Sequence, residues 1–203
     1  MEQQARLRSG VGPLDRLDRV PHVRVGAAVA LALAAAFIVW LVVGSGGHSS
    51  TAGSQLGAAV PTAGGTGPVA ESAQGLQAFA AAVGHPIYWA GASPGSTYEL
   101  TQTGNGRVYI RYLPAGVRVG VDKPYLTIAT YPFPHAFAVL KAMAKQHGGA
   151  IKLDHGGIGL VDRAYPKSVH LAFPGSDYQI EVFSPSPATS RQVVVAGGVA
   201  PVR

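Results

Sequence analysis

The chain has no cysteine among its 203 residues. That absence excludes a disulfide framework, thiolate metal sites, a cysteine nucleophile and a lipoprotein anchored through cysteine. It leaves the redox compartment of the protein open, because cysteine-free proteins occur in both oxidising and reducing compartments.

Charged side chains are also scarce: they make up 13% of the residues, whereas about a quarter is usual in soluble proteins. The deficit is local, since no Asp, Glu, Lys or Arg occurs between Val25 and Ala70. The net charge is +6, but no run of basic residues follows Arg24. Because nucleic-acid binding needs a clustered basic face, the sequence predicts no nucleic-acid partner. The many Ala, Gly, Val and Arg residues are typical of a GC-rich bacterial genome.

Residues Val25–Val43 form an uninterrupted apolar run of 19 residues. As a helix this run would be roughly 28 Å long, close to the bilayer's hydrocarbon thickness of about 30 Å. Trp40 lies near its outer end, where an indole ring prefers the membrane interface. A helix in a soluble core usually keeps a polar face. The run therefore predicts a single transmembrane helix, through which the chain contacts the membrane.

The charges that flank this run predict its orientation. Five arginines precede it, whereas the next Lys or Arg after it is Arg107. Under the positive-inside rule, residues 1–24 form a cytoplasmic tail and the C-terminal part lies outside the cell membrane. The run is longer than the roughly 7–15 apolar residues of a signal peptide, which favours an uncleaved signal anchor. Small residues at 42–44 and 50–52 leave cleavage open as the alternative.

Residues 44–72 are rich in Gly, Ser, Ala and Thr and carry no charge before Glu71. Such a stretch cannot bury enough apolar surface to offset the entropy of ordering its backbone. It predicts a flexible linker with a mean reach of roughly 30 Å. The linker would hold an extracytoplasmic domain over residues 73–203 near the membrane without fixing it there.

The periodicity of this outer domain mixes helices with many short strands. Helical spacing predicts helices over 76–83, 135–147 and 188–195. Alternating or β-branched stretches predict strands at 87–90, 98–103, 107–113, 125–131, 150–154, 158–161, 168–173 and 178–183. Runs of strands with few helices between them indicate an α+β domain. We expect an antiparallel sheet covered on one face by two or three helices.

Two hairpins have a register that the sequence specifies. A three-residue turn at 104–106, with its last glycine left-handed, pairs Leu100 with Ile110 on an inner face. A two-residue turn would mix apolar and charged side chains on each face, because a one-residue slip inverts a strand. A four-residue loop at 174–177 likewise pairs Leu171 with Ile180.

The same registers place polar side chains together on the other, outer face of the sheet, which we expect to be solvated. Tyr and Arg are enriched at binding interfaces, so this face is the candidate binding surface. His170 beside Glu181 is the cross-strand pair that resembles acid–base chemistry. The candidate binding residues are Glu99, Thr101, Tyr109, Arg111, His170 and Glu181.

Two motifs that suggest enzymes fail on inspection. Residues 91–95 match G-x-S-x-G, but Pro94 follows the serine and has no backbone N–H for an oxyanion. A strand also follows this motif where an esterase has a helix. The Gly157–Gly159 pair follows a strand without a helix after it, so it does not indicate a dinucleotide site.

Metal and cofactor signals are weak. Seven histidines are scattered without HxH, HExxH or helical i, i+4 spacing. His147, Asp154 and His155 are close enough in sequence to converge, but a histidine in the last turn of a helix is also explained by the helix dipole. We therefore expect no metal site, no cofactor and no catalytic residues.

The sequence thus favours a membrane-anchored extracytoplasmic binding domain without catalysis. Its partner would be an envelope protein, a wall polymer or a small ligand. One alternative is an extracytoplasmic hydrolase or lyase with a dispersed site around Asp162, His170 and Glu181. A small-ligand sensor or an accessory subunit of an envelope complex is another. Clustering of those three residues in one concave pocket would favour the enzyme.

Overall fold

The computed structural model of the chain describes residues 66–203 except residue 162. The predicted cytoplasmic tail, the predicted transmembrane helix and most of the predicted linker lie outside the described residues. No helix in the described part has the length and hydropathy needed to cross a bilayer.

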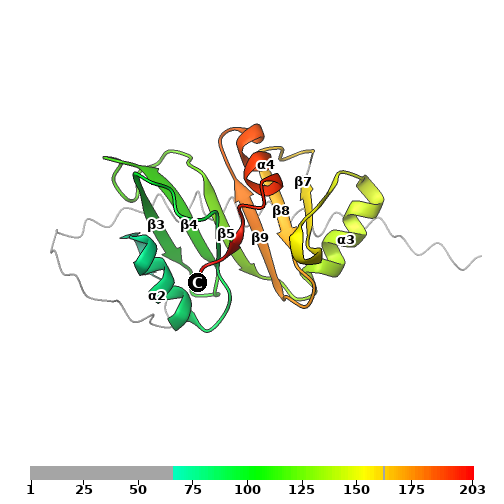
Figure 1. The fold of residues 1–203 in the computed structure, drawn as a ribbon, viewed down its shortest axis with the longest axis horizontal. Helices are drawn as coiled ribbons and strands as arrows, with labels where there is room; N and C mark the ends of the chain where they lie inside the picture. Colours follow the sequence, from blue (N-terminus) through cyan, green and yellow to red (C-terminus); the bar gives the residue numbers. More distant parts are fainter. Residues whose placement is uncertain (1–65, 162) are drawn as a thin grey trace, which may run out of the picture. The chain divides into compact units, whose positions relative to one another are not determined.

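The domain is α+β and is built on one eight-stranded sheet, in the order β1-β3-β4-β5-β9-β8-β7-β6 (Figure 1). Every neighbouring pair in this sheet is antiparallel. Its strands are β1 (Thr66–Glu71), β3 (Ser96–Gln102), β4 (Val108–Pro114), β5 (Thr127–Pro132), β6 (Ala150–Lys152), β7 (Ile158–Val161), β8 (Ser168–Ala172) and β9 (Tyr178–Phe183).

In the described residues, three α-helices and a short two-stranded ribbon accompany the sheet. The helices are α2 (Ala73–Val83), α3 (Ala136–His147) and α4 (Pro187–Val195), and a 3-10 turn, η1 (Asp154–Gly156), follows β6. The ribbon pairs β2 (Tyr88–Trp89) with β10 (Ala200–Pro201). Local sequence sets the ends of α2: the Ser72 side chain accepts a hydrogen bond from Gly75 N, and Gly84 adopts a left-handed conformation.

Both predicted hairpin registers are confirmed. In β3 and β4, Leu100 pairs with Ile110, and Gly106 has a φ of 77° as the three-residue turn requires. In β8 and β9, Leu171 pairs with Ile180. The local rule that apolar side chains share a face was therefore sufficient to set these pairings.

The face that carries these four residues, called here the apolar face, holds the main core. Leu76 of α2 and Val194 of α4 pack on it, together with Ile87 before β2. The ribbon is also tied to this face, because Tyr88 N donates to Thr130 Oγ1 at 3.1 Å. Figure 1 shows the C-terminal segment after α4 running across the sheet between α4 and α2.

Helix α3 corrects the expectation that one face of the sheet carries all the helices. Ala136 and Leu140 of α3 pack with Ala172 and Ile158. Ala172 is adjacent to Leu171 in β8, so its side chain points to the opposite face of the sheet. Helix α3 therefore covers one end of that second face, called here the polar face.

The first strand is a further difference from the sequence analysis, which placed residues 66–71 in the linker. These residues form β1, the edge strand that pairs with β3, with Val69 opposite Leu100. The pairing is irregular between Thr66 and Val69, and the Val69 side chain is 41% exposed. Backbone pairing with β3 holds this strand, and composition gives little signal for such pairing.

Candidate functional site

The six predicted binding residues lie on the polar face, in the registers that the hairpins impose. Glu99 pairs with Arg111, Thr101 with Tyr109, and His170 with Glu181. The expectation that this face is solvated is wrong, because five of the six are buried, with exposed fractions between 2% and 5%, and Thr101 is half-buried.

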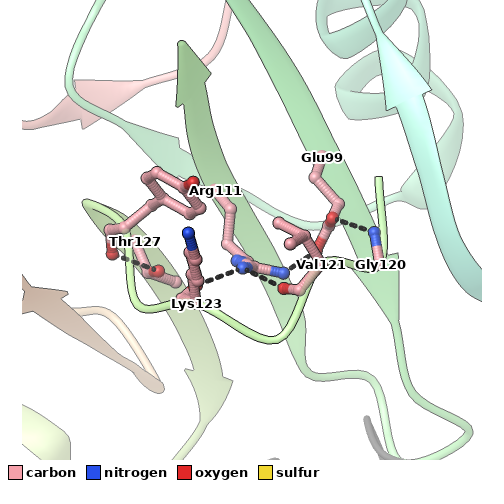
Figure 2. Close-up of polar contacts among 7 residues, drawn as sticks. Glu99, Arg111, Gly120, Val121, Lys123 and Thr127 are labelled. Carbon is pink, nitrogen blue, oxygen red and sulfur yellow. Dashed lines mark hydrogen bonds and ion pairs between the residues drawn. The ribbon is translucent and has the colours of Figure 1, made fainter. Parts of the chain in front are cut away.

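The Glu99–Arg111 pair holds a loop onto the polar face. Arg111 Nη1 donates to Glu99 Oε1 at 2.5 Å. Its Nη2 donates to the carbonyl oxygens of Val121 and Lys123, and Gly120 N donates to Glu99 Oε2 at 2.7 Å (Figure 2). The loop between β4 and β5 is thus fixed by a buried ion pair. A buried, hydrogen-bonded ion pair of this kind fixes the chain segment that it contacts.

A second polar group surrounds Glu181. Its Oε2 accepts a hydrogen bond from the Tyr131 hydroxyl, and its Oε1 accepts one from Ser168 Oγ at 2.6 Å. His170 Nδ1 lies 2.9 Å from Gln179 Nε2. The hydrogen bonds described for residues 66–203 therefore join His170 and Glu181 to different partners. Asp162, the third residue of the hydrolase or lyase hypothesis, lies outside the described residues.

Burial shifts the ionisation of the tyrosines in the sheet. It raises the pKa of Tyr131 well above its usual value, and the Glu181 carboxylate raises it further. Burial likewise raises the pKa of Tyr109 and of Tyr112, with Arg107 opposing the shift at Tyr109. These phenols stay protonated in the folded domain well into the alkaline range.

The opposite, apolar face contains a cleft of about 530 Å³. Its lining includes Leu171 of β8, Phe173 directly after β8, and Tyr88 of β2. One wall is the chain from Val194 to Pro201, at the end of α4 and in β10, and the other is the chain from Lys152 to His155. Its size falls in the range of about 300–1,000 Å³ that is usual for small-molecule sites.

The aromatic lining of the cleft is tightly arranged. The rings of Tyr88 and Phe173 stack with centroids 5.6 Å apart and an interplanar angle of 3°. Gly157 makes room for this arrangement, because a Cβ there would lie 2.6 Å from Phe173 Cδ1. Burial raises the pKa of the Tyr88 hydroxyl, partly offset by a hydrogen bond with Ser176. The stacked rings of Tyr88 and Phe173 thus give the cleft a flat aromatic patch.

Charged side chains lie around this apolar lining. Lys152, Asp154 and His155 come from the wall at β6 and η1, and Arg203 comes from the C-terminal segment. All four are exposed. His155 has a φ of 55°, and it shares a positive φ with only one other non-glycine residue of the described chain, His135.

Sequence reasoning missed this cleft but had one indication of it. Asp154 and His155, considered there with His147 for a metal site, both line the cleft, whereas His147 does not. Within residues 66–161 and 163–203, no group of three or more His, Cys, Asp or Glu side chains could hold a metal ion. The other cleft residues come together only because β10 returns to pair with β2.

The chain matches no protein-family model, no curated protein and no solved structure. The geometry of the described residues is therefore the basis for assigning a function.

Replacing Arg111 tests the role of the buried ion pair. Arg111→Met leaves the Glu99 carboxylate buried without its cation, and we expect it to lower the free energy of unfolding by about 3–5 kcal/mol. The double variant Glu99→Gln/Arg111→Met should lose less than the two single variants combined. Urea denaturation of the full chain in detergent micelles measures all three. Arg118→Met, in the same loop but exposed, should change stability by no more than about 0.5 kcal/mol. If the loss of stability in the double variant equalled the sum of the losses in the two single variants, the ion pair would not have this role.

The buried tyrosines predict a loss of stability at alkaline pH. Unfolded tyrosines ionise near pH 10, whereas the raised folded pKa values keep Tyr112 and Tyr131 protonated, so the unfolded state binds fewer protons above that pH. The free energy of unfolding should be insensitive to these groups below about pH 9 and fall above about pH 10, by up to about 1.4 kcal/mol per pH unit for each tyrosine. Urea titrations across this range measure the slope. Tyr112→Phe should reduce it and Tyr165→Phe, at a 49% exposed position, should not; a stability that rises in this range would contradict the prediction.

Proposed function

We propose that this chain is a membrane-anchored extracytoplasmic domain that binds a small ligand in the cleft on the apolar face, without catalysing a reaction on it. The cleft carries this proposal. It combines an apolar aromatic surface with a few charged groups around it, which is the usual composition of a small-ligand site. The walls are parts of the fold, so the site is formed before a ligand arrives.

The placement of the acid–base candidates favours binding over hydrolysis or lysis. His170 and Glu181 are on the polar face, whereas the cleft is lined by Leu171. Because successive side chains of a strand point to opposite faces, a ligand in the cleft is separated from both candidates by the sheet itself. A general acid or base must lie within hydrogen-bond reach of its substrate. Hydrolysis or lysis through His170 and Glu181 would therefore need a second cavity, on the polar face.

We further propose that the apolar run at 25–43 anchors the domain, with residues 1–24 in the cytoplasm. The arginines before the run and the lack of basic residues after it support this orientation. Both a small-ligand sensor and a ligand-binding subunit of a larger envelope complex fit a binding domain anchored in this way.

The absence of cysteine allows a direct test of topology. We expect Lys167→Cys, at an exposed position of the domain, to react with a membrane-impermeant maleimide in intact cells. Gln4→Cys should react only after the cells are permeabilised. The unmodified chain is the control for labelling of other groups. The reverse pattern, or recovery of the Lys167→Cys protein in the medium, would contradict an anchored outer domain.

Photolabelling tests the cleft as a binding site. Membranes containing the full chain are irradiated with 4-benzoylbenzamide, a neutral aromatic probe of suitable size. We expect saturable labelling at peptides that contain Phe173 or Ala200, since both residues line the cleft. Ala200→Trp fills the cleft and should abolish this labelling, whereas Ala138→Trp, exposed on α3, should leave it unchanged. Labelling that is unsaturable, or equal in both variants, would overturn the proposed site.

A further inference from the structure

We infer that the ligand of this cleft is an amphipathic anion: an apolar body with one carboxylate or phosphate group. This inference rests on the proposed function and specifies its ligand class. The apolar body lies along Leu171 and Phe173, and the anionic group lies among Lys152, His155 and Arg203.

The side-chain charges that line the cleft are unbalanced in favour of an anion. Two basic side chains, Lys152 and Arg203, and one acidic side chain, Asp154, belong to this lining, with the His155 imidazole as a further N–H donor. The ion pair described within residues 66–203 joins Arg111 to Glu99. Lys152 and Arg203 are therefore without a carboxylate partner in this part of the chain. Beside a low-dielectric wall their attraction for an anion is stronger than in open water.

Asp154 is the one acidic side chain among the described residues that line the cleft. Its carboxylate lies against the turn that ends α4, because a Cβ built on Gly197 would lie 3.4 Å from Asp154 Oδ2.

Arg203 is placed at the cleft by the fold. Val202, the residue before it, is 7% exposed, and its N–H donates to the carbonyl oxygen of Ile87 at 2.9 Å. The Arg203 carbonyl oxygen accepts a hydrogen bond from Gln77 Nε2 of α2. The backbone that carries the guanidinium is therefore fixed by α2 and by the chain leading into β2. A guanidinium on an anchored backbone loses less entropy on binding than one on a free segment.

His155 is held in a conformation that a glycine would adopt at lower cost. Its φ of 55° lies in the left-handed region, inside the turn that Gly157 N closes by donating to the Asp154 carbonyl oxygen. Strained residues of this kind concentrate at binding and catalytic sites. His155→Gly should leave the urea midpoint of the domain nearly unchanged while it raises the concentration at which an anion that contacts the imidazole half-saturates the cleft.

The apolar part of the ligand is indicated by Val195. This residue ends α4, lines the cleft and is 69% exposed. Like Phe173, it adds an apolar side chain to the lining of the cleft. An occupant with an apolar body would cover it, which a small inorganic anion would not do.

Introducing a negative or a positive charge at Val195 provides the sharpest test. The position is exposed, so its replacement leaves the core intact. The probe is 4-benzoylbenzoate, the anionic analogue of the neutral amide. We expect half-saturation of photolabelling at a concentration at least about tenfold lower for the anion than for the amide. Both replacements remove the same apolar contact, so the two variants differ mainly in charge: the anion should label Val195→Lys at a lower concentration than Val195→Glu, whereas the amide should label the two alike.

Matched pairs of cations control for general charge. Lys152→Met/Arg203→Gln should remove the preference for the anion. Lys145→Met/Arg191→Gln makes the same changes at exposed positions of α3 and α4 that do not line the cleft, and it should keep the preference. Competition by oleate and by 3-phenylpropionate identifies the source of the anion: displacement by oleate at the lower concentration indicates a lipid, and displacement by the short acid indicates a free metabolite.

The outcomes separate this inference from the proposed function. Equal labelling by acid and amide, or tighter labelling of Val195→Glu than of Val195→Lys by the acid, overturns the amphipathic anion but leaves a ligand-binding cleft. Failure of both probes to label the cleft saturably overturns the two together.

Discussion

The pairing of β5 with β9 is the interaction on which the rest of the domain depends. It joins Thr127 to Phe183 and continues to the pair of Pro132 with Tyr178. The hairpins on either side form between neighbours in sequence, whereas this contact closes a loop of roughly fifty residues and must offset its entropy. The apolar side chains of both hairpins supply that free energy, because pairing β5 with β9 makes their two inner faces one continuous surface. The cleft is built on that surface.

The alternation of side chains along each strand then separates two kinds of polar chemistry. On the polar face, Glu99 and Arg111 satisfy each other and the loop between β4 and β5, and Glu181 is satisfied by Tyr131 and Ser168. Buried charges with complete partners rigidify a fold and resist further interaction. At the cleft, on the other face, Lys152 and Arg203 are exposed. Buried, paired charges therefore position the chain, whereas exposed charges are free to contact a ligand. Burial and pairing distinguish the two groups more than residue type does.

The candidate site shows the same contrast between local and long-range information. The six residues chosen from the sequence share a face, as their registers required, but α3 and the loop held by Arg111 lie on that face. Sequence periodicity shows which side chains share a face and says nothing of what covers it. The cleft joins β2, the turn at Asp154 and the segment from Val194 to Arg203, which are far apart in the chain. His155 was noticed for its chemistry, and only the fold gave it neighbours.

The sequence by itself determined the C-terminal end of α2 at Gly84 and the two hairpins. Each depends on interactions within a few residues, namely a left-handed glycine and the alternation of apolar side chains. Only the tertiary structure decided that residues 66–71 join the sheet, that α3 packs on the polar face, and that β10 returns to β2 to form one wall of the cleft. These features depend on backbone edges and surfaces that exist only after distant segments have met, so no local pattern encodes them.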